Sequence, residues 1–127
     1  MPNFVRRRPQ IERIRLAAGL DTTELAAIER YAGNVYIQRN PTMADGKEAF
    51  IAYFTPMAQE YPGKHVYLKR VIAERDTVVL HCHHGCPGDS DWPGIDILRL
   101  DDNGKIAEHW DVLPPVSEQP ANDNMMF

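Results

Sequence analysis

The sequence predicts an α+β fold, with helices in its first half and an antiparallel sheet in its second half. Two observations support this class. Apolar residues recur at helical spacing up to about residue 61, and from His65 onward they recur at every second position. The later segments are joined by short connections, which are typical of antiparallel strands. Helices followed by such a sheet define the α+β class.

Three helices and one short strand are expected in the first half. The first helix covers residues 10–19 and the second covers 21–33, both bounded by typical start and stop residues. A strand follows at 35–38. The third helix covers about 44–61, and Pro56 predicts a kink or a break within it because proline lacks the backbone N–H of an interior helical position.

Four strands are expected in the second half, at residues 65–74, 77–84, 94–101 and 105–113. Tight turns join the first to the second and the third to the fourth. A longer loop rich in glycine, proline and aspartate, at 85–93, joins the second to the third. This order predicts a curved antiparallel sheet.

The chain has 127 residues, of which 43% are hydrophobic, and this size fits one domain. We expect the domain to span residues 10–116, with a flexible N-terminus at 1–9 and a flexible tail at 117–127. A net charge of −4 predicts neither a nucleic-acid partner nor a membrane partner. The expected location is cytoplasmic, and the two cysteines, Cys82 and Cys86, are expected to be free thiols.

Polar side chains gather on one predicted face of the sheet, because alternate residues of a strand share a face. Its members are Val79, His81 and His83 on one strand, Asp96, Leu98 and Leu100 on the next, and Ala107, His109, Asp111 and Leu113 on the last. Titratable groups among apolar neighbours indicate a pocket. We expect His84 to face the other way, near solvent, and Trp110 to point away from the pocket.

The opposite face is also largely apolar. It carries Leu80, Cys82, Ile95, Ile97, Ile106, Trp110 and Val112. Helices would therefore cover one face and a second subunit the other, which predicts a homodimer.

The groups on the polar face suit proton transfer beside a carbonyl. Asp111, among aromatic and apolar neighbours, would be the general base, with His109 or a histidine of another strand as its partner. Gln38, Asn40 or a histidine could stabilise the oxyanion of an enolate. The sequence contains no glycine-rich phosphate loop and no G-x-S-x-G motif.

A metal site is the alternative. The pair His81-x-His83 could present two imidazoles to one ion, with His109, Asp96 or Asp111 completing the ligands. The spacing is similar to the start of a cupin metal motif, but the glutamate that should follow is absent.

Three motifs resemble the SnoaL-like polyketide cyclases of the nuclear transport factor 2-like superfamily. They are YIQRNP at 36–41, ADGKEAF at 44–50 and GKIAEHWDV at 104–112, and the likeness covers roughly residues 20–116. The resemblance implies a cone in which helices pack into a strongly bent antiparallel sheet around a deep apolar cavity. It also implies that a carboxylate on the last strand, here Asp111, removes a carbon-bound proton without metal or cofactor.

These observations predict a SnoaL-like enzyme of lyase or isomerase type. It would act on a small, partly apolar carbonyl compound by proton abstraction, followed by aldol-type cyclisation or isomerisation. The candidate catalytic residues are Asp111 and His109, and the candidate substrate-binding residues are Gln38, Asn40, His81, His83, Asp96, Phe50 and Phe54. A non-catalytic dimeric ligand-binding module of the same fold is the alternative, and a metal-binding pocket through His81 and His83 is the third hypothesis.

Overall fold

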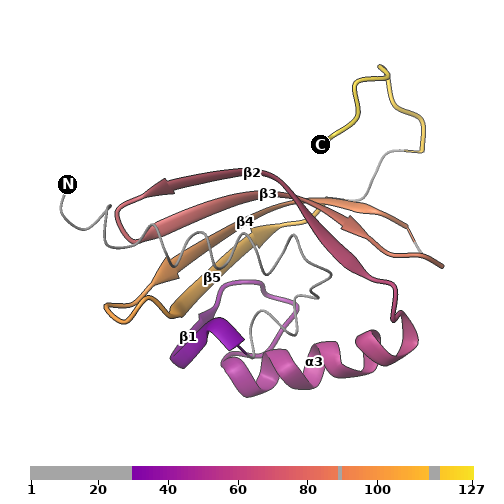
Figure 1. Cartoon of the computed structure of the whole chain (residues 1–127). Helices are drawn as coiled ribbons and strands as arrows, with labels where there is room; N and C mark the ends of the chain where they lie inside the picture. Colours follow the sequence, from indigo (N-terminus) through magenta and orange to yellow (C-terminus); the bar gives the residue numbers. More distant parts are fainter. Residues whose placement is uncertain (1–29, 89, 115–117) are drawn as a thin grey trace.

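The computed structural model describes residues 30–88, 90–114 and 118–127 (Figure 1). Its elements, in chain order, are β1 (Ala32–Gln38), α3 (Lys47–Glu60), β2 (His65–Glu74), β3 (Thr77–Gly85), β4 (Trp92–Leu100) and β5 (Ile106–Val112). The strands form one sheet in the order β1-β5-β4-β3-β2, and the sheet arches over α3. The predicted α+β class is confirmed.

The second half of the chain follows the prediction closely. Strand β2 has the predicted bounds, β3 extends one residue further, β4 begins two residues earlier, and β5 is one residue shorter at each end. The pairs β2–β3, β3–β4 and β4–β5 are antiparallel, as predicted. Strand β1 pairs in parallel with β5. No hairpin joins these two strands, so local turn chemistry does not set their relative direction.

The predicted helices agree with the structure only in part. Residues 10–19 and most of 21–33 lie outside the described residues; of the described end of the second predicted helix, residues 30–31 are helical and residues 32–33 belong instead to β1. Helix α3 begins at Lys47 rather than near residue 44, because Gly46 adopts a φ of 96°, outside the helical region. Pro56 does not break α3, which continues to Glu60.

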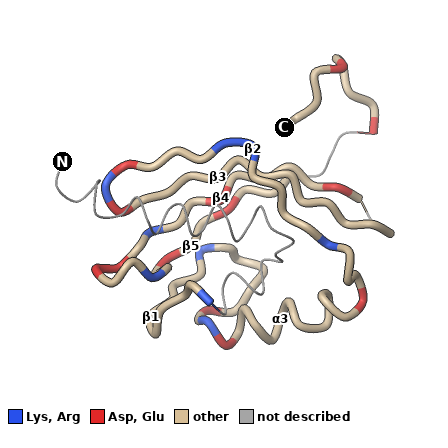
Figure 2. The backbone as a smooth tube through the Cα atoms, in the orientation of Figure 1, with Lys and Arg blue, Asp and Glu red and all other residues tan. Residues whose placement is uncertain are grey.

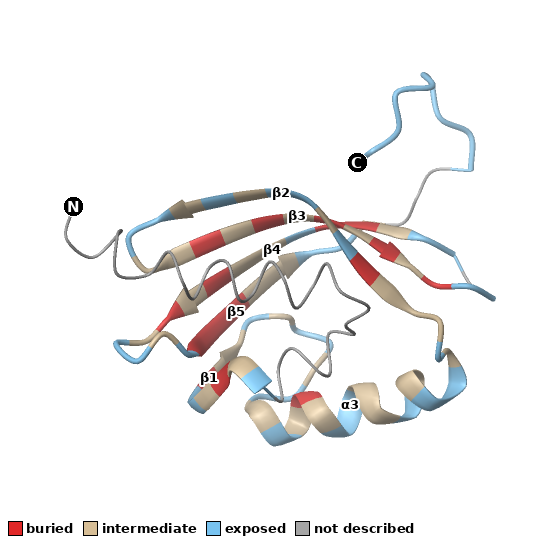
Figure 3. Ribbon diagram, in the orientation of Figure 1, coloured by how far each residue is buried: buried red, intermediate tan, exposed pale blue. Residues whose placement is uncertain are grey.

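The core lies between α3 and the inner face of the sheet, which we define as the face toward α3 (Figure 3). Its buried members include Tyr36 and Phe50, whose rings meet edge to face with centroids 6.0 Å apart. Phe54 packs against Phe50 at a centroid distance of 4.5 Å. The remaining buried core residues are Ala32, Val66, Val78, Leu80, Cys82, Leu98, Leu100 and Ile106.

The outer face of the sheet, turned away from α3, exposes apolar side chains. Ile72 is 63% exposed and Val112 is 66% exposed, and Ile95 lies on the same face. The predicted homodimer would use this face, and it stays a prediction.

Acidic and basic side chains are mixed along the described backbone, many of them at strand ends (Figure 2). Among the described residues, no helix is both long and apolar enough to cross a membrane.

A carboxylate on β5 joins three elements at the outer side of the sheet. Glu108 is buried, and its two oxygens accept hydrogen bonds from Arg39 and Arg99, each at 2.9 Å. The hydrogen bond from Arg99 lowers the pKa of Glu108, burial raises it, and Arg39 lowers it further, so the pKa lies below its ordinary value. The cluster joins β4 and β5 to the end of β1.

Replacing Glu108 with glutamine should therefore reduce stability by roughly 1 kcal/mol at neutral pH, a modest loss because both arginines are partly exposed. The folded-state pKa is below the unfolded one, so this contribution is complete above the unfolded pKa and is lost as pH falls through the folded pKa. In thermal unfolding, the gap between wild type and Glu108→Gln should close in acid. Glu74→Gln, at the exposed end of β2, is the control, and a gap that does not change with pH would contradict the assignment.

Candidate active site

The centre of the inner face is a hydrogen-bonded chain around His109. Its Nε2 lies 2.8 Å from Asp96 Oδ1, and its Nδ1 lies 3.0 Å from Gln38 Oε1. The parallel pairing of β1 with β5 places Gln38 directly beside His109. The ring of Tyr36 lies nearly parallel to that of His109, with centroids 6.5 Å apart. Three strands thus contribute to one site.

The contacts of the Gln38 side chain show which of its end atoms faces His109. Its Oε1 accepts the backbone N–H of Asn40 at 3.0 Å, so this atom is an oxygen and an acceptor toward His109 as well. Asp96 is the second acceptor. Both ring nitrogens of His109 therefore face acceptor atoms, and a ring that carries a proton on each nitrogen would satisfy both contacts.

Asp111 lies next to the His109 ring. Its Oδ2 is 4.0 Å from His109 Nε2 and accepts a hydrogen bond of 3.1 Å from the Asn40 side chain. The Asp111 side chain is only 7% exposed. A carboxylate that accepts a hydrogen bond from an amide and lies beside an imidazole ring can accept a proton from a bound compound.

Asp96 connects His109 with a second imidazole. Its other oxygen, Oδ2, lies 3.7 Å from Nε2 of His84, which is 5% exposed. Burial raises the pKa of Asp96, but its interactions with His109 and His84 outweigh burial and hold that pKa well below its usual range. Asp96 is therefore ionised at neutral pH.

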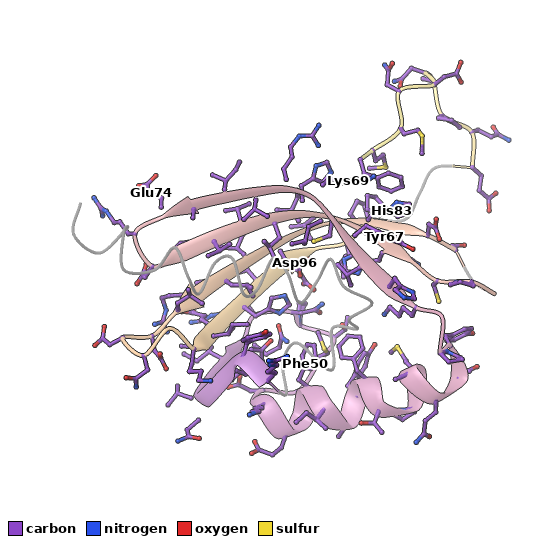
Figure 4. The ribbon with its side chains drawn as sticks, viewed as in Figure 1. Phe50, Tyr67, Lys69, Glu74, His83 and Asp96 are labelled. Atoms are coloured by element: carbon purple, nitrogen blue, oxygen red, sulfur yellow. The ribbon has the colours of Figure 1, made fainter. Side chains whose placement is uncertain are left out.

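The expectation that His81 and His83 share this face is wrong. In the register of β3 with β4, Leu80 is opposite Asp96 and His81 is opposite Ile95, so both histidines lie on the outer face. Figure 4 shows His83 on the side away from Asp96 and Phe50. The next residue, His84, is on the inner face instead, contrary to the prediction that it lies near solvent.

The two outer histidines have separate partners. His81 Nδ1 accepts from Arg70 at 2.8 Å, and its Nε2 lies 2.8 Å from the carbonyl oxygen of Met126. His83 Nε2 lies 2.8 Å from Asp91, and the ring of Phe127 stacks on it at 3.8 Å. Among the described residues, neither histidine belongs to a group of three close metal-binding side chains, so these contacts do not support the predicted metal site.

His83 also lines an open hollow at the outer side of β2 and β3. Its other lining residues are Gly63, Tyr67, Lys69, Gly85, Cys86, Pro87 and Asp91. Figure 4 labels Tyr67, Lys69 and His83, and of these His83 contacts the C-terminal segment through Phe127. This hollow is separated from Asp111 by the thickness of the sheet.

The remaining predicted site residues belong to the inner side. Gln38 and Asn40 contact His109 and Asp111, as described above. Phe50 is buried in the core, and Phe54 lies partly buried beside it, so the two rings form an apolar wall between α3 and the sheet. The structure thus brings together all the predicted site residues except the two outer histidines.

Sequence reasoning missed two residues of this site. Tyr36 is buried, and its hydroxyl lies 3.4 Å from Gln38 Nε2. His84 follows Leu80 and Cys82 at alternate positions, and this apolar pair was the signal that His84 belongs to the buried face.

Comparison with known proteins defines the class of this fold and then its family. The fold is the nuclear transport factor 2-like α+β cone, and residues 14–109 match the family model described as the SnoaL-like domain. The chain belongs to this family. No match is found among curated proteins.

Solved structures share the fold at low sequence identity. TsrD from Streptomyces laurentii is 19% identical, with a TM-score of 0.66, over 84% of this chain and 89% of that one. A candidate polyketide cyclase from Bacillus cereus is 22% identical, with a TM-score of 0.64, over 82% and 74%. A candidate ketosteroid isomerase from Kribbella flavida is 16% identical, with a TM-score of 0.65, over 94% and 88%. At these identities the likeness establishes the fold alone.

Proposed function

We propose that this protein is an enzyme of lyase or isomerase type that removes a proton from carbon next to a carbonyl group. The observation that carries the proposal is the buried group of Asp111, His109 and Asp96 on the inner face. It combines a carboxylate base with a fixed positive charge in an apolar surrounding. The names of the Bacillus cereus and Kribbella flavida proteins are consistent with this class.

Asp111 is the proposed base. It takes the proton from the activated carbon, and the electron pair of the C–H bond becomes the enolate of the substrate. Asp111 then carries the proton and returns it to another carbon or to oxygen. Asn40 holds the carboxylate in position by its 3.1 Å hydrogen bond.

His109 has the proposed role of a fixed charge. Its two N–H groups are occupied by Asp96 and Gln38, so it does not donate directly to the substrate in this arrangement. Its positive charge, 4.0 Å from Asp111, favours the ionised base before the reaction and the enolate charge after it. Asp96 and Gln38 keep the ring in place.

The proposed substrate is a small, partly apolar carbonyl compound. Phe50, Phe54 and Tyr36 supply aromatic surface on the same side of the sheet as Asp111, and such surface favours a substrate with an apolar or aromatic portion. The reaction that follows enolate formation would be aldol-type cyclisation or isomerisation.

Hydrogen exchange tests the proposed function without knowledge of the natural substrate. In D₂O, the protein should accelerate deuterium incorporation at the activated CH₂ of simple aryl-substituted β-diketones, followed by NMR. Binding of these compounds without accelerated exchange would contradict catalysis and would favour the alternative, a non-catalytic ligand-binding module. Variants of the candidate residues, measured in the same assay, then show which of them contribute to catalysis.

Asn40 offers a sharp test of the geometry. Replacing it with aspartate places a second carboxylate at hydrogen-bond distance from Asp111, and two adjacent carboxylates do not both ionise readily. The acid limb of the pH–rate profile for exchange should move to higher pH by about one unit or more. Asn34→Asp, at an exposed position of β1, should leave the profile unchanged, and an equal shift in both variants would contradict the contact with Asp111.

A further inference from the structure

A second group of chemically reactive side chains lies beside the proposed acid/base group and shares Asp96 with it. Cys82 and His84 occupy alternate positions of β3, so they share the inner face, and both are buried, at 1% and 5% exposure. The thiol sulfur of Cys82, a ring nitrogen of His84 and a carboxylate oxygen of Asp96 all lie within 4.8 Å of one another. Cys82 forms no disulfide bond.

The neighbouring strand leaves room for this arrangement. Gly94 is directly opposite Cys82 in the β3–β4 register. A Cβ atom at position 94 would lie 2.9 Å from Nε2 of His84, closer than real contacts allow. The imidazole therefore occupies the space in which a side chain of β4 would stand. Because residue 94 is glycine, His84 can lie across β4 beside Asp96.

The spacing of the donors matches a transition-metal site. Zinc binds sulfur at about 2.3 Å and histidine nitrogen or carboxylate oxygen at about 2.0–2.2 Å, so tetrahedral N and O ligands lie about 3.4 Å apart. The distance from His84 Nε2 to Asp96 Oδ2 is 3.7 Å, which is longer than an ordinary hydrogen bond and close to that value. A small shift of the His84 ring would bring the two atoms to the separation expected of zinc ligands.

We propose that Cys82, His84 and Asp96 bind a divalent transition-metal ion of the zinc type. A thiolate, an imidazole and one carboxylate form a donor set that favours zinc or cobalt over magnesium and calcium, which prefer oxygen ligands. Three protein ligands leave one coordination position open. On binding, the Cys82 thiol loses its proton to solvent, and the sulfur–hydrogen bond is replaced by a sulfur–metal bond.

The two sites would share one carboxylate. Asp96 Oδ2 faces His84, whereas Oδ1 accepts from His109, so an ion on the first oxygen leaves the contact with His109 in place. A bound metal ion would thus be connected to the proposed acid/base group through Asp96. The inference does not depend on Asp111 being a base, because binding can be measured without turnover.

Cobalt(II) is the probe for this test. The full chain, reduced with a phosphine and freed of metal, is titrated with Co²⁺ and followed by absorption. The expected result is a thiolate-to-cobalt charge-transfer band that saturates at one ion per chain, with visible bands of a four-coordinate ion. One equivalent of Zn²⁺ should abolish both. Absence of the charge-transfer band at stoichiometric cobalt in the wild type would overturn the proposal.

Matched variants identify the ligands. Cys82→Ser should abolish the charge-transfer band, and His84→Gln should weaken binding at least tenfold. Cys86→Ser and His83→Gln change the neighbouring residues of the same types outside the cluster and should bind as the wild type does. Retention of the band in Cys82→Ser, or its loss in Cys86→Ser, would overturn the assignment. If Cys82→Ser does not fold, a zinc-induced rise in melting temperature in Cys86→Ser and its absence in His84→Gln decide the question.

Discussion

Replacing Asp111 with asparagine is expected to lower the rate of catalysed hydrogen exchange by about 10²–10⁴-fold, the usual contribution of a general base. Asparagine has the same shape as aspartate but cannot accept the substrate proton at neutral pH. Its side-chain oxygen can still accept the hydrogen bond from Asn40, so the fold and the affinity for a bound diketone should change little. Rate, binding and melting temperature are measured on the same preparations.

Asp91→Asn is the matched control for this prediction. Asp91 pairs with His83 on the outer side of the sheet, and its pKa is lowered first by that hydrogen bond and then by the backbone N–H of Cys86. It is a carboxylate beside an imidazole, as Asp111 is, but on the other face. If Asp91→Asn abolished exchange and Asp111→Asn did not, the active site would be the outer hollow and the proposed assignment would be wrong.

Replacing Gly94 with alanine should be the most damaging single-methyl change on the sheet. The added Cβ would lie 2.6 Å from Leu113 Cδ2 and 2.9 Å from His84 Nε2. Leu113 is partly exposed and can move, but the His84 ring is buried and must rotate away from Asp96. Overpacking of this kind costs about 1–3 kcal/mol, measured by chemical unfolding.

Gly94→Ala should also affect catalysed exchange. Because His84 helps to keep Asp96 ionised, its displacement should weaken the Asp96–His109 pair and reduce catalysed exchange. Gly63→Ala is the control, since its Cβ would lie 3.2 Å from the ring of the exposed Pro87 and requires only a small adjustment. Equal stability of Gly94→Ala and the wild type would contradict the described position of His84.

The sequence was sufficient to predict the sheet strands and most of the site. Alternation placed Asp96 and Leu98 on one face of β4, and His109 and Asp111 on one face of β5, and their pairings Asp96–Asp111 and Leu98–His109 confirm that these faces coincide. A short turn joins these two strands, so it limits the possible registers.

Which residues of β3 lie on the inner face could not be predicted in the same way. A long loop joins β3 to β4, and this connection does not fix the register, so a shift of one residue exchanges the two faces. Val79 and Leu80 are both apolar, which left the pattern ambiguous at that strand. This ambiguity is why His83 was assigned to the pocket in place of His84. The contact of Gln38 with His109 was also inaccessible, because it depends on the parallel pairing of strands far apart in sequence.

The position of ligand binding tests the central claim most directly. The chain has five histidines, and their ring C–H signals can be assigned in NMR spectra with single His→Gln variants. Titration with 2-naphthol, whose oxygen resembles an enolate, should shift the signals of His109 and leave those of His81 and His83 in place. Shifts confined to His81 and His83, with His109 unaffected, would contradict an active site on the inner face.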